Sequence, residues 1–321
     1  MGRADGLQVV LGASGGTGRA IVDELVRQGR RVRAVSRGTI ADLPAGVEHV
    51  RADLYDVAAA TSAIAGASVV YHAAQPAYDK WAGNFERLNA SVGDAAAAAG
   101  ARLVFADNLY MYGPGASPMH EATPQRATDR KGALRTKLAA DLLARHRRGE
   151  LEVVIGRSAD YFGPHGTNSG LGGRAFGNLV AGKAAAAAGA VDQPHSFSYL
   201  PDLARAMVVL GDRDEAAGSA WHLPVMDPMT ARAFLERAAK VAGVPPKLHV
   251  DGPLTLRIAG LFMPMAREVT VVLYQWTEPF VSDWSAFEAA FGPFDRTPLD
   301  DALAATIAWW RAEAALTAKA G

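Results

Sequence analysis

Cysteine is absent from this 321-residue sequence. Disulfides, thiolate nucleophiles and cysteine-based metal sites are therefore excluded, although the absence does not identify a compartment. The histidines His72, His165 and His195 are not spaced as metal ligands, so we expect each to be a satisfied or surface histidine. We accordingly predict no metal site.

An excess of charge of one sign is also lacking, because the 33 basic and 33 acidic residues cancel. Such a chain has no sequence-wide field that would attract nucleic acid or an anionic membrane. We therefore expect neither nucleic acid nor a membrane as a partner. A small-molecule substrate is the expected partner, and a homodimer is one assembly that the chain could form.

Long apolar runs are missing as well. The most apolar late stretch, residues 254–276, is interrupted by two arginines, a proline and a glutamate, so it falls short of the roughly 18 apolar residues that a membrane span needs. The first strand-like run begins at Gln8, which leaves little room for a cleavable signal peptide before it. We expect a cytoplasmic protein.

Short β-rich runs alternate with helix-length segments through the first half of the chain. This alternation predicts an α/β fold, a doubly wound parallel sheet of about seven strands with crossover helices. The Gly-rich, Pro-rich and amphipathic segments that follow predict a smaller C-terminal substrate domain. The runs in the first half are residues 8–11, 16–28, 31–35, 68–72, 84–99, 102–105, 128–148 and 152–155.

A glycine-rich loop follows the first strand-like run and opens a helix-length segment. Glycine permits a tight turn and a close approach of the backbone to a diphosphate, and the helix N-terminus supplies free N–H groups. The alternative, a glycine turn without a ligand, is disfavoured because strand, spacing and helix agree. The residues expected to contact a dinucleotide here are Gly12, Ser14, Gly15, Gly16, Thr17 and Gly18.

Arg37 follows the second strand, where a site that prefers NAD usually carries Asp or Glu for the ribose 2′-OH. An arginine can instead pair with a 2′-phosphate, so the sequence favours NADP(H) as cofactor. The alternative is that Arg37 is a solvated loop charge. Further cofactor contacts are expected from Ser36, Asp53, Leu54, Ala73 and Ala74.

With these residues, the chain resembles the extended short-chain dehydrogenases/reductases of the NAD(P)-dependent epimerase/dehydratase family. The resemblance covers most of the chain, and the order and spacing of its motifs are specific. It implies a Rossmann domain of residues 1–160 and 194–217 and a substrate-binding domain of residues 161–193 and 218–321, with residues 184–188 in a strand. The motifs are GASGGTG at 12–18, ADL at 52–54, VYHAA at 70–74, Asn89, MYG at 111–113, Lys137, Arg157, FGP at 162–164 and FSYLPDLA at 197–204.

The catalytic residues of that family are incomplete here. Its members usually carry Tyr-x-x-x-Lys, in which Tyr is the general acid/base and Lys holds the nicotinamide ribose. By the resemblance Lys137 is the family lysine, but Ala133 stands at the tyrosine position and Asn108 at the position of the catalytic Ser or Thr. The chain therefore resembles an atypical member of the family, one without that tyrosine and hydroxyl.

Tyr110 lies two residues after Asn108 on the same strand end, so both side chains are expected on one face. Tyr110 could replace the lost acid while Asn108 donates an N–H to a carbonyl oxygen. On this hypothesis the charge of Lys137 lowers the pKa of Tyr110. The alternative is that Tyr110 packs as an aromatic side chain.

Four further residues are expected to line the substrate pocket. By the resemblance, Tyr78 and Trp81 follow the fourth strand on a loop beside the nicotinamide, although packing is an equal alternative for both. Asp160 and His195 replace an Asn and an Arg that often bind a nucleotide-sugar. A carboxylate disfavours a neighbouring diphosphate, so we predict that nucleotide-sugars bind poorly.

Three functions are consistent with these residues. The first is an NADP(H)-dependent oxidoreductase that reduces a carbonyl or a related polarised double bond on a small, largely uncharged molecule. The second is an epimerase or dehydratase that retains its cofactor. The third is a non-catalytic protein that senses NADP(H), which the lost tyrosine favours and the retained lysine and large substrate domain disfavour.

Overall fold

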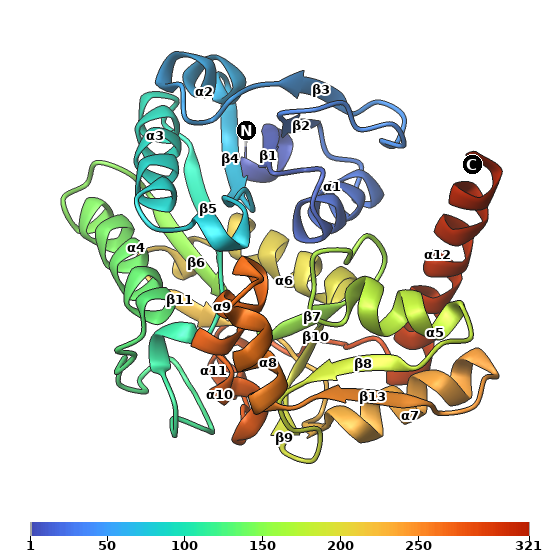
Figure 1. The fold of residues 1–321 in the computed structure, drawn as a ribbon. Coiled ribbons are helices and arrows are strands. Elements are labelled where there is room, and N and C mark those ends of the chain that lie inside the picture. The colour runs from blue at the N-terminus through green and yellow to red at the C-terminus, as the bar shows by residue number, and fades with distance from the viewer. Residues whose placement is uncertain (1, 321) are drawn as a thin grey trace.

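Seven parallel strands form the central sheet of the protein, a computed structural model that describes residues 2–320 (Figure 1). Their order is β11-β6-β5-β4-β1-β2-β3. This doubly wound Rossmann arrangement confirms the fold class predicted from the sequence. The strands are β1 (Leu7–Leu11), β2 (Val32–Ser36), β3 (Glu48–Arg51), β4 (Ala67–His72), β5 (Arg102–Asp107), β6 (Val153–Arg157) and β11 (Ala220–His222).

Helices cover both faces of this sheet because its strands are apolar on both sides. In β1, Val9 packs into the core under α2, α3 and α4, whereas Val10 packs into the core under α1 and α6. Alternate residues of β1 thus pack against the helices on opposite faces of the sheet. The helices are α1 (Gly16–Arg27), α2 (Val57–Ile64), α3 (Asn84–Ala98), α4 (Arg130–Arg147) and α6 (Leu200–Asp212).

Three two-stranded sheets and several helices form a second region beside the carboxyl ends of the central strands (Figure 1). Residues 185–188 form a strand, as the resemblance implied. The pairs are β7 (Asp160–Phe162) with β10 (Phe197–Tyr199), β8 (Ala185–Ala188) with β13 (Leu248–Asp251), and β9 (Pro194–His195) with β12 (Met229–Thr230). The helices are η4 (Gly172–Gly177), α5 (Asn178–Val180), α7 (Ala231–Ala242), α8 (Pro253–Gly260), α9 (Pro264–Val271), α10 (Tyr274–Thr277), α11 (Ser285–Phe291) and α12 (Leu299–Ala320).

Two segments from the part of the chain assigned to the substrate domain pack with the Rossmann domain instead. Strand β11 lies beyond residue 217 and yet completes the central sheet beside β6. In α11, Phe287 is buried in the same core as α1 and α6. Both segments are too short to show a period in the sequence, so only their packing reveals where they belong. None of the helices within residues 2–320 combines the length and the apolar character that crossing a membrane requires.

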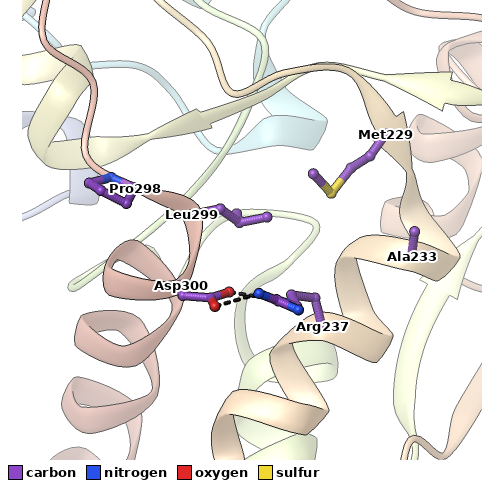
Figure 2. A pocket seen from close by; sticks show the side chains of 6 residues that line it. All are labelled: Met229, Ala233, Arg237, Pro298, Leu299 and Asp300. Carbon is purple, nitrogen blue, oxygen red and sulfur yellow. Dashed lines mark hydrogen bonds and ion pairs between the residues drawn. The ribbon is translucent and has the colours of Figure 1, made fainter.

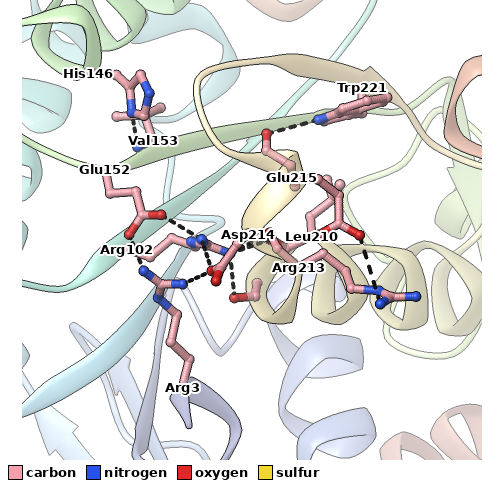
Figure 3. Close-up of polar contacts among 12 residues, drawn as sticks. Arg3, Arg102, His146, Glu152, Val153, Leu210, Arg213, Asp214, Glu215 and Trp221 are labelled. Atoms are coloured by element: carbon pink, nitrogen blue, oxygen red, sulfur yellow. Dashed lines mark hydrogen bonds and ion pairs between the residues drawn. The ribbon is translucent and has the colours of Figure 1, made fainter. Parts of the chain in front are cut away.

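A buried arginine ties α6 to the amino-terminal edge of the sheet (Figure 3). Arg102 opens β5, and its guanidinium donates to the Arg213 carbonyl oxygen at 2.7 Å, just after α6. It also pairs with Glu152 at 2.5 Å and with Asp214 at 2.9 Å, and Arg3 contacts the same two carboxylates. A cation at a helix C-terminus satisfies carbonyl groups that the helix leaves unpaired.

Candidate active site

The glycine loop between β1 and α1 is closed by contacts that no larger side chain would allow. Gly12 has φ +79°, and a Cβ there would lie 2.7 Å from the Ala74 backbone nitrogen. A Cβ on Gly18 would lie 2.3 Å from the Gly12 carbonyl oxygen. These two glycines therefore hold the start of α1 against the ends of β1 and β4, as the sequence motif predicts. Ala73 and Ala74 continue directly from β4 beside this loop.

The start of α1 is covered at Gly16, where a Cβ would lie 2.9 Å from the His165 carbonyl oxygen, and open at Gly15. Its N-cap, Gly15, has no side chain to accept from the first-turn amides. A Cβ on Gly15 would meet only the Gly12 carbonyl oxygen at 3.5 Å, which is an ordinary contact. Ser14 is exposed and Thr17 is half-buried beside these amides. Free N–H groups at a helix N-terminus fit a diphosphate, so this loop can hold a dinucleotide.

At the adenine end, Arg37 is exposed just beyond β2 and has no ion-pair partner within residues 2–320. The hydroxyl of Ser36 donates to the Gly38 carbonyl oxygen at 2.5 Å and is therefore occupied within the protein. Asp53 is exposed and accepts from the Tyr55 backbone nitrogen at 3.1 Å, whereas Leu54 is buried. Arg37 and Asp53 are the two charged groups here that a nucleotide could reach.

Aromatic side chains gather beyond the carboxyl ends of β4 and β5. The hydroxyl groups of Tyr78 and Tyr110 are 3.4 Å apart, and the ring of Trp81 stacks near that of Tyr110 with centroids 6.3 Å apart. Asn108 accepts from the Tyr110 backbone nitrogen at 3.1 Å through Oδ1. The structure thus brings together these four residues, which the sequence placed near the substrate.

Burial raises the pKa of Tyr110 to about 12, and the negative charge of Asp160 acts in the same direction. This result corrects the hypothesis that Lys137 lowers that pKa: the cation that acts on Tyr110 is Arg135, and its lowering effect is smaller than the increase caused by burial and Asp160. The phenol of Tyr110 is therefore protonated at neutral pH. It can donate a hydrogen bond or a proton, but it is poorly suited to accept one.

Asp160 and His195 form a pair across two of the small sheets. His195 Nε2 lies 2.9 Å from Asp160 Oδ2, and Nδ1 lies 3.0 Å from the Gln275 carbonyl oxygen. Both ring nitrogens therefore face oxygen atoms, which hold the imidazole at its two ends. The imidazole also stacks on Trp276, with ring centroids 4.1 Å apart and planes 7° apart.

Lys137 requires a correction. Its side chain is 57% exposed and pairs with Asp141 at 2.6 Å, so it does not point toward the glycine loop or the aromatic residues. Helix α4 begins at Arg130 with Asp129 as its N-cap. This start turns Lys131 and Arg135, one helical turn apart, toward the protein interior, and they are 2% and 4% exposed. The buried cationic pair of this helix is therefore Lys131 and Arg135.

The Lys131 ammonium lies between two rings and a carboxylate. Its Nζ is 3.6 Å from the ring centroid of Tyr78, 4.2 Å from that of Trp81 and 3.0 Å from Glu268 Oε2 in α9. Burial lowers the pKa of Lys131, and Glu268 opposes that shift. The lysine is thus a cation held under aromatic faces beside Tyr78.

The guanidinium of Arg135 lies at the carboxyl ends of β4 and β5. One guanidinium nitrogen is 3.3 Å from Asp107 Oδ1, and another donates to Gln75 Oε1 at 3.1 Å. The guanidinium also lies 4.4 Å from the ring centroid of Trp81. A positive group therefore stands beside the strand ends, the edge at which doubly wound sheets bind ligands.

Gln275 is a further residue that the sequence did not indicate. Its side chain is 5% exposed, and its Oε1 has no hydrogen-bond partner within the described residues. The same side chain acts on Tyr110 and moderates the increase in the pKa of that phenol. A short apolar helix such as α10 gives no sequence signal for an inward-facing amide, so only the structure could find it.

A separate cavity lies between α7 and the start of α12 (Figure 2). It has a volume of about 490 Å³ and is spanned by an ion pair of 2.5 Å between Arg237 and Asp300. No residue of the glycine loop or of the aromatic group lines it, so it is not part of the candidate active site. Its lining residues are Met229, Ala233, Arg237, Pro298, Leu299 and Asp300.

The doubly wound sheet and its glycine loop define a dinucleotide-binding Rossmann protein. Residues 8–223 match the model of the NAD dependent epimerase/dehydratase family, and the chain therefore belongs to that family. The match confirms the family that the sequence motifs resemble. A nicotinamide dinucleotide is accordingly the cofactor class. No curated protein matches the sequence.

Solved structures share this fold. An epimerase from Methanothermobacter thermautotrophicus is 15% identical, covers 99% of this chain and 96% of its own, and has a TM-score of 0.82. The WbmH enzyme of Bordetella bronchiseptica, solved with NAD⁺, is 20% identical over 96% of this chain and 98% of its own, with a TM-score of 0.73. The UDP-glucose 4-epimerase of Thermotoga maritima, solved with UDP-glucose, is 15% identical over 96% and 99%, with a TM-score of 0.79.

Proposed function

We propose that the chain is an NADP(H)-dependent oxidoreductase that reduces a carbonyl or a related polarised double bond on a small, largely uncharged molecule. The observation that carries this proposal is the protonated Tyr110 phenol, held beside Tyr78 at the strand ends where the family binds its dinucleotide. When bound, a reduced nicotinamide supplies the hydride.

Tyr110 favours the direction of reduction. An alkoxide that forms on the substrate is a far stronger base than a phenolate, so a phenol with a pKa of about 12 can protonate it. The reverse reaction needs a tyrosinate to accept the alcohol proton. Burial and the Asp160 charge both disfavour that anion. The site therefore contains an acid suited to carbonyl reduction.

Arg135 replaces Lys137 as the cation that we propose for the nicotinamide ribose. It is buried, lies at the ends of β4 and β5, and donates to Gln75 in the segment that follows β4. Lys131 holds the Tyr78 loop, because its Nζ donates to the Tyr78 carbonyl oxygen at 2.6 Å. Lys131 is thus a positioning residue for the Tyr78–Tyr110 contact.

The 2′-phosphate is assigned to Arg37, which is exposed and without an ion-pair partner in the described chain. No acidic residue occupies the position just beyond β2 that would accept from the ribose 2′-OH of NAD. A guanidinium can bind a phosphate through two parallel hydrogen bonds, which supports NADP(H) as the preferred cofactor.

The substrate pocket offers little for a nucleotide-sugar. His195 is buried and stacked on Trp276, and both its ring nitrogens are occupied by Asp160 and the Gln275 backbone, so it is not free to bind an added anion. A diphosphate would need a free cation at this point and would meet the Asp160 carboxylate instead. The pocket therefore favours a largely uncharged molecule. Asn108, Tyr78 and Gln275 remain to orient it.

A retained-cofactor epimerase or dehydratase is the second candidate, and the family match favours it. Such an enzyme oxidises and then reduces the same substrate, so it consumes no net cofactor. A sensor that binds NADP(H) without turnover is the third candidate. Net cofactor consumption separates the first function from the other two.

The test is to follow nicotinamide absorbance while the purified protein and NADPH meet a panel of ketones, aldehydes and enones. A parallel panel contains UDP- and dTDP-sugars, with products analysed by chromatography. We expect NADPH oxidation with a carbonyl compound and no conversion of a sugar nucleotide. Conversion of a sugar nucleotide without net NADPH loss would establish the epimerase instead. Cofactor binding with no turnover on either panel would favour the third candidate, a sensor that binds NADP(H).

A further inference from the structure

Helices α8 and α9 form a hairpin with an exposed apolar tip. At the turn between them, Leu261 is 77% exposed, Phe262 81% and Met263 57%. Both helices extend the apolar surface next to this turn. The apolar tip, as defined here, consists of Leu254, Ile258, Leu261, Phe262, Met263 and Met265. A soluble monomer rarely leaves so many large apolar side chains together in water without a binding role.

The hairpin does not need these side chains for its own packing. A Cβ on Gly260 would lie 3.2 Å from Arg267 Cα, so the two helices approach closely at this glycine. Leu256 is buried on the inner side of α8, whereas the tip residues point away from it. The tip is therefore available to a partner while the hairpin stays folded.

The charge carried by the hairpin itself, between Asp251 and Glu268, has one sign. Residues 252–267 contain Arg257 and Arg267 and no Asp or Glu, although the chain as a whole is balanced at 33 basic and 33 acidic residues. Both arginines are exposed, and neither has an ion-pair partner in the part of the chain that the structure describes. An apolar tip flanked by cations complements a lipid surface with anionic headgroups.

We propose that this hairpin docks the protein on an anionic lipid bilayer, with the apolar tip inserted at the boundary between headgroups and acyl chains. Consecutive apolar residues are exposed at the turn. A flat protein interface would cover only one side of the turn, whereas lipid can surround all of it. This exposure therefore supports a bilayer rather than a second copy of the chain as the occupant. The contact is peripheral. It differs from the expectation of no membrane partner, which was drawn from the balanced charge and the lack of a membrane span.

The hairpin is connected to the candidate active site. Glu268 follows Arg267 in α9 and pairs with Arg130 at 2.5 Å and with Lys131 at 3.0 Å. Docking would thus hold the Tyr78 and Lys131 side of the site near the lipid surface. The docking itself does not depend on which reaction the site performs.

Vesicle flotation tests the proposal with the purified full chain. The vesicles contain either phosphatidylcholine alone or phosphatidylcholine mixed with phosphatidylglycerol. We expect the protein to float with the anionic vesicles and to stay in solution with the neutral ones. Phe262→Ser should lower the partition by about tenfold, and the double variant Arg257→Glu/Arg267→Glu by at least about tenfold.

Leu316→Ser is the matched control, because Leu316 is 62% exposed on α12 and should not affect vesicle binding. Phe262 is mostly exposed, so its replacement should leave the thermal unfolding temperature unchanged. A wild-type chain that stays in solution with both vesicles overturns the proposal. So does equal binding to neutral and anionic vesicles, or a lipid-free dimer that Phe262→Ser converts to a monomer.

Discussion

Lys131 and Lys137 lie on the same helix, six residues apart, and meet opposite environments. The Lys131 side chain is 2% exposed and pairs with the Glu268 carboxylate, whereas that of Lys137 is 57% exposed and pairs with Asp141 in solvent. A buried and an exposed ion pair contribute differently to stability. When one member of a buried pair is removed, the other stays buried without water to solvate its charge, whereas the remaining member of an exposed pair is solvated.

Replacing these two lysines should therefore give different stability changes. Lys131→Met should lower the free energy of unfolding by about 2 kcal/mol, because the Tyr78 carbonyl oxygen loses its donor and Glu268 keeps only the half-exposed Arg130 as a partner. Lys137→Met should change it by less than about 0.5 kcal/mol. Urea unfolding of both variants measures the two values. Similar losses in the two variants would contradict the buried placement of Lys131.

Tyr110→Phe should lower the turnover of an identified carbonyl substrate by about 10² or more, as loss of a general acid does. The affinity for NADPH should stay nearly unchanged, since the phenol is assigned to the substrate. The wild-type rate should not fall between pH 7 and pH 9 through this group, because its pKa is raised to about 12. Steady-state kinetics and calorimetric titration provide these values. A variant with the wild-type turnover would make Tyr110 a packing residue.

Arg37→Ala should weaken NADP⁺ binding by about 1.5–3 kcal/mol, the usual contribution of a charge-assisted pair. Binding of NAD⁺ should be nearly unchanged, and this cofactor is the internal control because it lacks the 2′-phosphate. Calorimetric titration of both proteins with both cofactors measures the difference. Equal affinities of the wild type for NADP⁺ and NAD⁺ would rule out the assignment.

The sequence predicted the fold class, the glycine loop and the family, because these depend on local chemistry in a fixed order. Gly12 and Gly18 are examples, since their lack of a Cβ is visible both in the motif and in the contacts. The cation of α4 that faces the strand ends was harder to predict. Its identity depends on where α4 begins. If the family motif is aligned two residues further toward the N-terminus, the position assigned to Lys137 falls on Arg135.

The N-cap of α4 is the sequence signal that identifies the inward-facing cations of this helix. Asp129 accepts from the backbone nitrogens of Lys131 and Gly132, which is the usual N-cap arrangement and fixes the start of the helix. From this start, Lys131 and Arg135 share a face. Gln275 and the strand β11 had no comparable signal, because their positions depend on contacts with segments far away in the sequence.

Two buried histidines should make stability depend on pH. Burial lowers the pKa of His72 to about 4 and that of His222 to about 3, compared with the ordinary value of 6.5. Below pH 6.5 the unfolded chain binds protons at these sites and the folded chain does not, so stability is lost as the pH falls. Each site should contribute a loss of about 2 kcal/mol between pH 7 and pH 5.

Urea unfolding at the two pH values measures this loss, with His222→Gln expected to show a smaller decrease than the wild type. The control is His249→Gln, since the His249 side chain is 62% exposed. Glu24 and Glu268 have lowered pKa values and act mainly below their ordinary value of 4.5, outside this window. Identical pH dependence in the wild type and His222→Gln would contradict the prediction.

The ion cluster around Arg102 joins parts of the chain that are synthesised far apart. Arg3 and Asp214 are separated by 211 residues in the sequence and meet only at this edge of the sheet. Such contacts close a long loop, so they form after local helices and early strand pairs. Interactions that are absent from a folding transition state mainly slow unfolding. We therefore expect the cluster to slow unfolding and so to prolong the lifetime of the folded chain.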